Sequence, residues 1–337
     1  MTQTQRTALV IGATGGIGGA IAERLAADGW TIRALNRQPD KARVGREAFE
    51  WVQGDAMVEA DVVAAAAGAE LIVHGANPPG YRNWAGLQLP MLASTIAAAK
   101  ATGARILFPG TVYNYGPDAF PTITEASPQT PISRKGAIRV KMEQALRDAQ
   151  VPVLIVRTGD FFGPKPSGSS WLSQGLVKPG RPVASVMYPG PLEIPHAWAY
   201  LPDVAETFVR LLATDLGRFE MLQMQGQQAN GHELIAALET AAGRKLAVSR
   251  LPWLAIAAAA PFNETLREMR EMRDLWNRPV LLDNTSLVAK LGAEPRTPLS
   301  EALRTALAGL GALPPIIAQD STSQGSRPGR PEPELRA

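Results

Sequence analysis

A short apolar segment near the N-terminus runs directly into a glycine-rich turn and then into a helical pattern. The apolar residues are 9–11, and glycines follow at three-residue spacing as Gly12, Gly15 and Gly18. Such a turn bends sharply, lets the backbone approach a phosphate and packs the helix onto the strand, while free amides at the helix start attract the anion. This feature therefore predicts a dinucleotide-binding loop. We expect its contacts to come from Gly12, Thr14, Gly15, Gly16, Ile17 and Gly18.

Strand-like and helix-like segments alternate over the first half of the chain. The expected strands include residues 30–35, 70–74, 104–108 and 153–157, and the expected helices include residues 92–101 and 138–149. Alternation of this kind predicts an α/β fold, a Rossmann-type doubly wound parallel sheet with helices on both faces. We assign residues 1–160 to this NAD(P)-binding domain.

The pattern changes after residue 160. Between residues 161 and 202, proline and glycine interrupt the periodicity, which favours loops and short strands. Helical patterns return over residues 203–213, 232–242, 263–276 and 298–310. We expect residues 161–312 to form mostly a smaller C-terminal substrate-binding lobe, with some segments returning to the Rossmann domain. Residues 313–337 are rich in proline, serine, glycine and arginine, and we expect a disordered tail there.

The residues after the second expected strand bear on the choice between NAD and NADP. An acidic residue there would bind the ribose 2′-hydroxyl of NAD, but this chain has Asn36 and Arg37, followed by Lys41 and Arg43. Cations at this place suit the 2′-phosphate of NADP. The sequence therefore favours NADP over NAD, with a solvated basic loop as the alternative.

Asp55 and Ala56 follow the third expected strand. At the end of that strand they could meet the adenine of the dinucleotide. Alternatively, Asp55 could be the N-cap of a helix over the alanine-rich residues 57–67.

Composition limits the kinds of partner. The chain has 34 basic and 31 acidic residues, and this small excess does not favour nucleic-acid binding. It contains no cysteine, which excludes disulfides and thiolate chemistry. The three histidines, His74, His196 and His232, lack the spacing of metal ligands, so we expect no metal site.

Membrane and export signals are weak in this sequence. The apolar run over residues 251–262 contains Pro252 and Pro261 and is shorter than the roughly 20 residues that span a bilayer. Polar residues lead directly into the first strand and leave no room for a secretory signal. We expect a cytoplasmic protein without a membrane partner.

Three further motifs follow the glycine loop in order. Residues 73–77 read Val-His-Gly-Ala-Asn, residues 157–164 read Arg-Thr-Gly-Asp-Phe-Phe-Gly-Pro, and residues 200–205 read Tyr-Leu-Pro-Asp-Val-Ala. Together they resemble the extended short-chain dehydrogenase/reductase superfamily, the group of NAD-dependent epimerases and dehydratases. The resemblance covers residues 7–310 and implies cofactor contacts at Gly75 and Ala76. It also implies a homodimer through the expected helices 92–101 and 138–149.

The catalytic residues of that family are only partly retained. The resemblance places Thr111 at its Ser or Thr position, Lys135 where the catalytic tyrosine belongs, and Arg139 where the lysine follows. The Tyr-x-x-x-Lys motif is therefore degenerate. Tyr113, Tyr115 or Lys135 could donate the proton instead, while Arg139 is a poor acid that could bind ribose hydroxyls or an anion. Structural alternatives are a solvated Lys135 at a helix start and a packed Tyr115 ring.

Two functions fit these residues. The first is an NAD(P)-dependent oxidoreductase or epimerase that acts on a small polar carbonyl or hydroxyl substrate through a non-standard proton donor. Asn77, Asp160 and His196 lie where open α/β sheets bind ligands and are the expected substrate contacts. Asp160 stands near the place of the family's asparagine, and an acid facing a diphosphate disfavours a nucleotide sugar. The second function is an NADP-binding sensor without turnover, like the nitrogen regulators that share this fold and lack the tyrosine.

Overall fold

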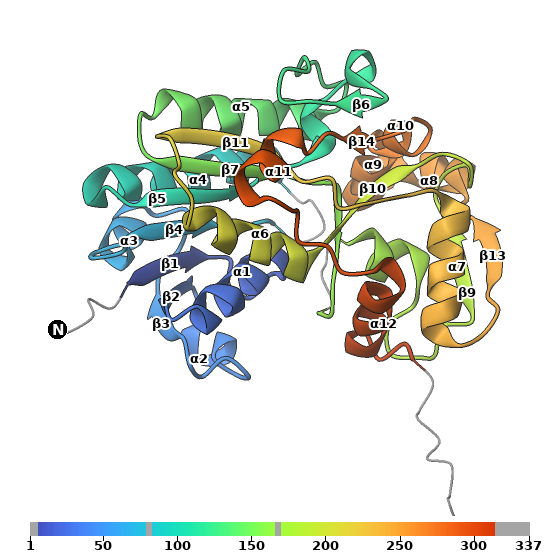
Figure 1. Cartoon of the computed structure of the whole chain (residues 1–337), viewed down its shortest axis with the longest axis horizontal. Helices are drawn as coiled ribbons and strands as arrows, with labels where there is room; N and C mark the ends of the chain where they lie inside the picture. Colours follow the sequence, from blue (N-terminus) through green and yellow to red (C-terminus); the bar gives the residue numbers. More distant parts are fainter. Residues whose placement is uncertain (1–5, 79–82, 166–169, 314–337) are drawn as a thin grey trace, which may run out of the picture.

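A sheet of seven parallel strands forms the centre of the molecule (Figure 1). The structure is a computed structural model that describes residues 6–78, 83–165 and 170–313. The strand order is β11-β7-β5-β4-β1-β2-β3. The bounds are β1 Thr7–Ile11, β2 Thr31–Asn36, β3 Glu50–Gln53, β4 Leu71–His74, β5 Arg105–Pro109, β7 Val153–Arg157 and β11 Phe219–Gln223. The predicted α/β fold class is confirmed.

Helices cover both faces of the sheet because its strands are apolar on both sides. In β1, Ala8 and Val10 belong to the core under α1 and α6, whereas Leu9 and Ile11 belong to the core under α3, α4 and α5. The helices of the two faces are α1 Gly16–Ala27, α6 Leu201–Leu212 and α11 Thr285–Leu291, and α3 Glu59–Ala65, α4 Trp84–Thr102 and α5 Arg134–Asp148; the short α2 Pro39–Ala42 precedes β3. The strand order reverses between β1 and β4, and open α/β sheets bind ligands at such a point.

The second lobe is built from small sheets and helices at one end of the molecule (Figure 1). Its strands are β6 Thr122–Ile123, β8 Asp160–Phe162, β9 Ser185–Tyr188, β10 His196–Tyr200, β12 Gln227–Ala229, β13 Ala247–Arg250 and β14 Leu281–Leu282. Its helices are α7 Gly231–Ala242, α8 Trp253–Ala259, α9 Glu264–Glu271, α10 Arg273–Trp276 and α12 Leu299–Gly309. A separate apolar core holds this lobe together.

Several predicted boundaries differ from the structure. The helix predicted from residue 92 begins at Trp84 and contains Pro90, because Trp84 and Gln88 are buried and hold the earlier turns in place. The helix predicted over residues 263–276 is two helices, α9 and α10, separated at Met272. The predicted tail lies outside the described residues except for Leu313. Within the described ranges, no helix is both long enough and apolar enough to cross a membrane.

Candidate active site

The glycine loop packs so closely that side chains are excluded at three of its positions. Gly12 has a φ of +91°, and a Cβ there would lie 2.6 Å from the carbonyl of Gly75. A Cβ at Gly18 would lie 2.4 Å from the Gly12 oxygen, and one at Gly75 would lie 2.7 Å from the Gly18 Cα. Gly15 is exposed at the N-cap of α1, whose first turn carries no acidic residue. The loop therefore offers an open, electropositive helix start to an anion.

Arg37, the cation directly after β2, is exposed to solvent. The Asn36 side chain accepts a hydrogen bond from the Gln38 amide at 2.8 Å, which shapes the turn, and Arg37 and Lys41 are exposed. The exposed Arg37 is available to a 2′-phosphate, while the solvated-loop alternative stays open.

Asp55 organises a turn and does not cap a helix. Its carboxylate accepts from the Met57 amide at 3.0 Å, whereas α3 begins at Glu59 with Val58 at the N-cap. The alternative that Asp55 caps a helix over residues 57–67 is wrong, because the Asx turn delays the helix by two residues. Asp55 and the adjacent Ala56 remain half-buried at the end of β3, where both could contact a ligand.

Arg46 is a cation near the loop that the sequence reasoning missed. Its guanidinium lies 3.6 Å from the Cβ position of Gly19 and its Nε lies 3.7 Å from the Glu23 carboxylate. Nine residues, which include α2, separate Arg46 from Asn36, so no local pattern indicates that Arg46 folds back onto α1.

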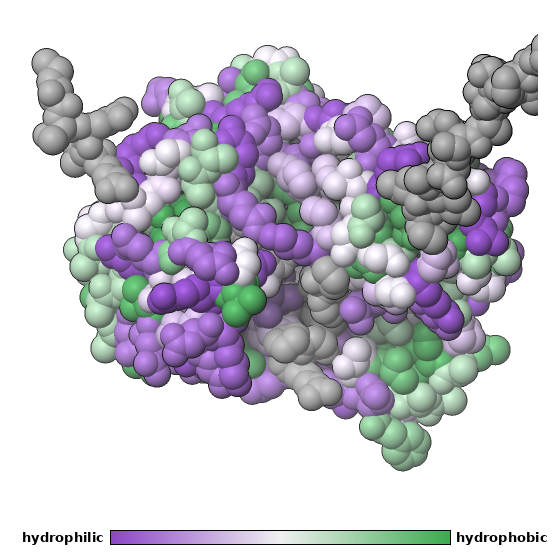
Figure 2. Space-filling model, turned by 90° about the horizontal axis from the view of Figure 1, so that it is seen from below, coloured by the Kyte–Doolittle hydropathy of each residue, from purple (hydrophilic) through white to green (hydrophobic). Residues whose placement is uncertain are grey.

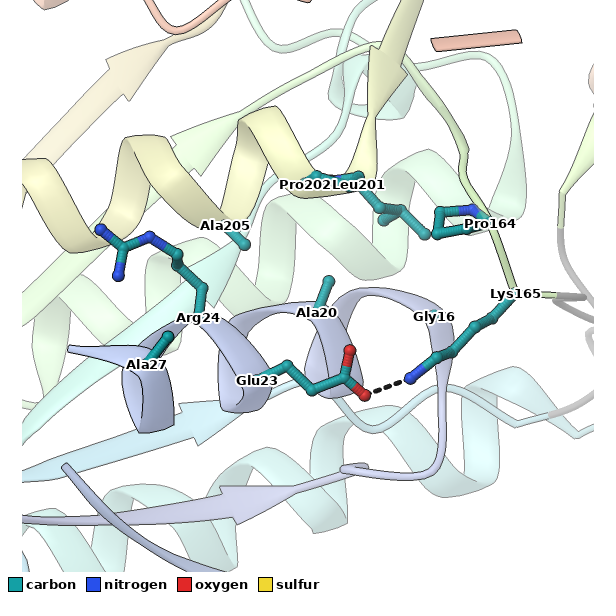
Figure 3. Close-up of a pocket in the computed structure, with 10 residues that line it drawn as sticks. All are labelled: Gly16, Ala20, Glu23, Arg24, Ala27, Pro164, Lys165, Leu201, Pro202 and Ala205. Atoms are coloured by element: carbon teal, nitrogen blue, oxygen red, sulfur yellow. Dashed lines mark hydrogen bonds and ion pairs between the residues drawn. The ribbon is translucent and has the colours of Figure 1, made fainter. Parts of the chain in front are cut away.

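A groove of about 280 Å³ runs along the outer side of α1, against α6 (Figure 3). Ala20, Ala27 and Ala205 are small enough to let the two helices approach each other. At the end near Gly16, the Lys165 ammonium points to α1 and pairs with Glu23 (Figure 3). The lining of the groove is largely apolar. Such a lining fits helix packing beside the phosphate loop better than catalysis.

Asn77 orients the segment after β4. Its side-chain oxygen accepts from the Trp84 indole at 2.9 Å and from the Gln88 amide at 3.1 Å. Gly75 and Ala76 lie between this bond and the glycine loop, half-buried beside Gly12. Because the oxygen of Asn77 is engaged with α4, its role is first to hold the loop.

Tyr113 lies in a hydrogen-bonded network with Asp160 and His196. Thr111 caps the short turn η2 Val112–Asn114 directly after β5, and its hydroxyl accepts from the Tyr113 amide at 3.4 Å. The Tyr113 hydroxyl donates to Asp160 Oδ1 at 3.0 Å, and Asp160 Oδ2 lies 2.7 Å from His196 Nε2. The His196 ring stacks on Trp276 at a centroid distance of 4.0 Å and an angle of 6°. Asp160 and His196 thus lie behind Tyr113 in a continuous chain of hydrogen bonds.

Tyr115 occupies a different, buried environment. Its hydroxyl accepts from the Arg157 guanidinium and from the Gln223 amide, and Arg157 also pairs with buried Glu143. Burial raises the pKa of Tyr115 to about 12. A phenol with this pKa is a poor proton donor at neutral pH. The structure thus agrees with the alternative that Tyr115 is a packed ring.

Lys135 is enclosed, so the alternative of a solvated lysine is wrong. Its Nζ donates to the Glu268 carbonyl at 2.8 Å and lies 3.2 Å from the carboxylate of the same residue. Burial lowers the pKa of Lys135, and the Glu268 carboxylate opposes that shift. The ammonium is thus engaged by α9, which the sequence spacing could not reveal.

Arg139 lies across the end of β5. It donates to the Pro109 carbonyl and sits 4.7 Å from the centre of the Phe108 ring. Burial lowers its pKa to about 10, which leaves it a cation at neutral pH. Its Nε is buried without a partner among the described residues, so a donor remains for a ligand oxygen.

Comparison with known proteins bears on the family and the fold of the chain. The family described as the NAD dependent epimerase/dehydratase family matches residues 8–220. No curated protein matches the chain.

Similar solved structures include three from bacteria. UDP-glucuronic acid 4-epimerase from Bacillus cereus, solved with UDP-glucuronic acid and NAD, is 18% identical with a TM-score of 0.69, covering 90% of this chain and 98% of that one. UDP-glucose 4-epimerase from Bifidobacterium longum, solved with NAD+ and UDP, is 16% identical with a TM-score of 0.66, covering 89% and 97%. The Bordetella bronchiseptica enzyme WbmH, solved with NAD+, is 19% identical with a TM-score of 0.66, covering 90% and 98%. At these identities the likeness shows the fold.

Proposed function

We propose that this chain, which belongs to the NAD dependent epimerase/dehydratase family, transfers hydride between its nicotinamide cofactor and a small polar substrate that carries a hydroxyl or carbonyl group. The observation that carries the proposal is the Tyr113 phenol, hydrogen-bonded to Asp160 and placed two residues after Thr111. Family membership makes the chain an NAD-dependent enzyme and so favours turnover over a sensor role.

The residues around the glycine loop fit a dinucleotide. The close packing of Gly12, Gly18 and Gly75 leaves backbone in place of side chains where a pyrophosphate would approach. When bound, the cofactor supplies a hydride acceptor or donor. The compared epimerases were solved with NAD, so a preference for NADP rests on Arg37, with Lys41 and Arg46 as further cations nearby in the chain.

Tyr113 supplies the proton step in this proposal. As the substrate hydroxyl is oxidised, its proton passes to the Tyr113 oxygen, while the phenol proton passes to Asp160 Oδ1. Reduction of a carbonyl runs through the same bonds in reverse. His196 holds the Asp160 carboxylate from the other side, and Thr111 stands beside Tyr113 to bind the reacting oxygen. A carboxylate that accepts the phenol proton thus replaces the ammonium that activates the family's tyrosine.

Asp160 also limits the substrate class. The carboxylate lies within hydrogen-bond distance of both Tyr113 and His196, and a diphosphate placed near it would be repelled. We therefore favour a small polar substrate over a nucleotide sugar. We further infer a cytoplasmic enzyme with a cofactor domain over residues 1–160 and a substrate lobe mostly over residues 161–312, and a homodimer through α4 and α5.

Substitution of Tyr113 tests the proton step. Tyr113→Phe should lower kcat by about 100-fold or more, the usual contribution of a general acid or base. The dissociation constant for the cofactor should stay the same in calorimetric titration. Turnover would be followed with UDP-glucuronic acid, UDP-glucose and dihydroxyacetone, by nicotinamide absorbance and by NMR of the substrate.

Tyr188→Phe is the matched control, because the Tyr188 hydroxyl is buried with no hydrogen-bond partner among the described residues. It should keep wild-type activity. Full turnover by Tyr113→Phe would remove Tyr113 from the mechanism, whereas cofactor binding without turnover in the wild type across a broad panel would favour the sensor.

Arg37 tests the choice of cofactor. Arg37→Asp should weaken NADPH binding roughly 10- to 100-fold, as expected when a charge-assisted bond to a phosphate is lost. NADH binding should not weaken. Arg43→Asp is the control, because Arg43 is exposed at the far end of α2. An equal loss in both variants would indicate only a general effect of basic residues in this segment.

A further inference from the structure

The apolar run that is too short to span a membrane forms an exposed projection of the second lobe. Residues 253–262 contain no charged side chain and form α8 and the turn η5 Ala260–Phe262. Leu254 is 88% exposed and Phe262 is 92% exposed. Figure 2 shows hydrophobic side chains gathered on a projection at the end of the molecule that carries α8 in Figure 1. Large apolar side chains grouped in this way on a surface mark a contact site.

The projection is anchored to the lobe beneath it. Ile256 and Ala260 are buried on the inner side of the segment, and the Trp253 indole donates to the Pro189 carbonyl at 2.6 Å. Leu254 and Phe262 are therefore held outward by a fixed support and are not part of a loose loop.

Cations surround this apolar projection. The neighbouring segments place exposed arginines on both sides of it, and the Arg273 guanidinium lies 5.7 Å from the centre of the Trp253 ring. The exposed arginines are Arg250, Arg267, Arg270 and Arg273. Residues 244–273 hold six cations and three acidic residues, and two of those acids, Glu268 and Glu271, already pair with α5. The third acid, Glu264, lies 3.9 Å from Arg267. Lys245 pairs with Glu239, and Arg267 also lies 3.9 Å from Glu268. The exposed Arg250, Arg270 and Arg273 therefore make the rim of the projection positive.

We propose that this projection docks the protein on a membrane surface that carries anionic lipid headgroups. A segment with an apolar side and flanking arginines lies in the headgroup region, its apolar side chains entering the acyl boundary while cations meet the lipid phosphates. A second copy of the chain would bring arginine against arginine, which opposes self-association. A convex tip also needs no matching pocket in a bilayer, whereas a protein partner would have to provide one. This docking is peripheral, departs from the expectation that the protein has no membrane partner, and is independent of the proposed reaction.

Vesicle flotation of the full chain tests the proposal. The probes are vesicles of phosphatidylcholine alone and of equal parts phosphatidylcholine and phosphatidylglycerol. The protein should bind the mixed vesicles, and the binding should weaken as salt rises. The double variant Leu254→Ser/Phe262→Ser should lose roughly 100-fold in partitioning, because two large side chains no longer leave water. Arg250→Gln/Arg270→Gln should reduce both the binding to mixed vesicles and its dependence on salt.

Val44→Ser is the matched control, because Val44 is 77% exposed in the loop after α2, outside the projection. It should bind like the wild type, and thermal unfolding should show that all variants are folded. Absence of wild-type binding to mixed vesicles, equal binding to phosphatidylcholine alone, or unchanged binding of the Leu254/Phe262 variant would overturn the proposal. So would a dimer in light scattering that the same variant dissociates. Since no cofactor or substrate is present, these results do not depend on the enzymatic activity.

Discussion

His74 makes stability depend on pH at the scale of a single residue. Its ring lies at the end of β4, stacks on Phe108 and binds the Thr95 hydroxyl through Nδ1 at 2.8 Å. Burial lowers its pKa from 6.5 to about 3. Between these pH values His74 is protonated in the unfolded chain but neutral in the folded protein. Its contribution to the free energy of unfolding is therefore fully present above pH 6.5 and is lost as the pH falls. Between pH 6.5 and about 4.5 the free energy of unfolding should drop by roughly 2–3 kcal/mol through this residue.

Urea unfolding at several pH values checks this prediction. His74→Asn should flatten the dependence of unfolding free energy on pH in that range, whatever its effect at neutral pH. His232→Asn replaces an exposed histidine and serves as the control. Parallel curves for the wild type and His74→Asn would show that His74 is not the group responsible.

Single residues also show where sequence reasoning stops. A Cβ at Gly18 would meet Gly12, six positions earlier, so the spacing of these two glycines is informative, whereas the close approach of Gly75 to Gly12 cannot be read from it. Tyr113 and Tyr115 look equivalent in sequence, yet the partners of Tyr115 lie 42 and 108 positions later in the chain, at Arg157 and Gln223. Which phenol is buried among charges and which lies beside Asp160 is decided by tertiary packing.

At the scale of elements, α9 is tied to the start of α5 by a partly buried ion-pair cluster. Lys135 is enclosed against Glu268, while Arg134 pairs with both Glu268 and Glu271. Glu268→Gln leaves the buried ammonium without its counter-charge and should lower the free energy of unfolding by about 3 kcal/mol or more. Adding Lys135→Met to Glu268→Gln should recover most of that loss, because no buried ammonium is then left without a counter-charge.

A double-mutant cycle in urea measures this coupling. Lys245→Gln is the control, since it breaks an exposed pair with Glu239 and should change the free energy of unfolding little. If Glu268→Gln cost no more than this control, the cluster would not join α9 to α5.

The sequence located α5 and α9 but not their link. Apolar residues three or four positions apart predict both helices, since this spacing reports which side of each helix is buried. The pairing of Lys135 with Glu268 joins residues 133 positions apart, and a pattern within one helix contains no information about it. The same contact replaces the interpretation of Lys135 as a solvated residue with that of a buried part of the cluster.

At the scale of the whole molecule, the alternation of strands and helices predicts a parallel sheet, whereas it does not predict where the last strand of that sheet comes from. β11 begins 59 residues after residue 160, pairs in parallel with β7 and adds the outer strand on that side. α6 likewise comes from beyond residue 160 and packs on α1. Segments from the second half of the chain thus complete the Rossmann domain, as expected from the sequence. The sequence did not indicate that β11 and α6 are these segments.

A fragment of residues 1–160 should therefore fail to fold alone. It lacks Val204, Phe208 and Leu211 of α6, which are buried in the core shared with α1. Burial of such side chains contributes about 1.5–3 kcal/mol each, so their loss approaches the 5–15 kcal/mol that separates folded from unfolded domains. Thermal unfolding followed by circular dichroism should show no cooperative transition for this fragment. A chain of residues 1–313 should unfold like the full chain, because it keeps every described element. A sharp transition in the 1–160 fragment would mean that β11 and α6 only cover a domain that is already stable.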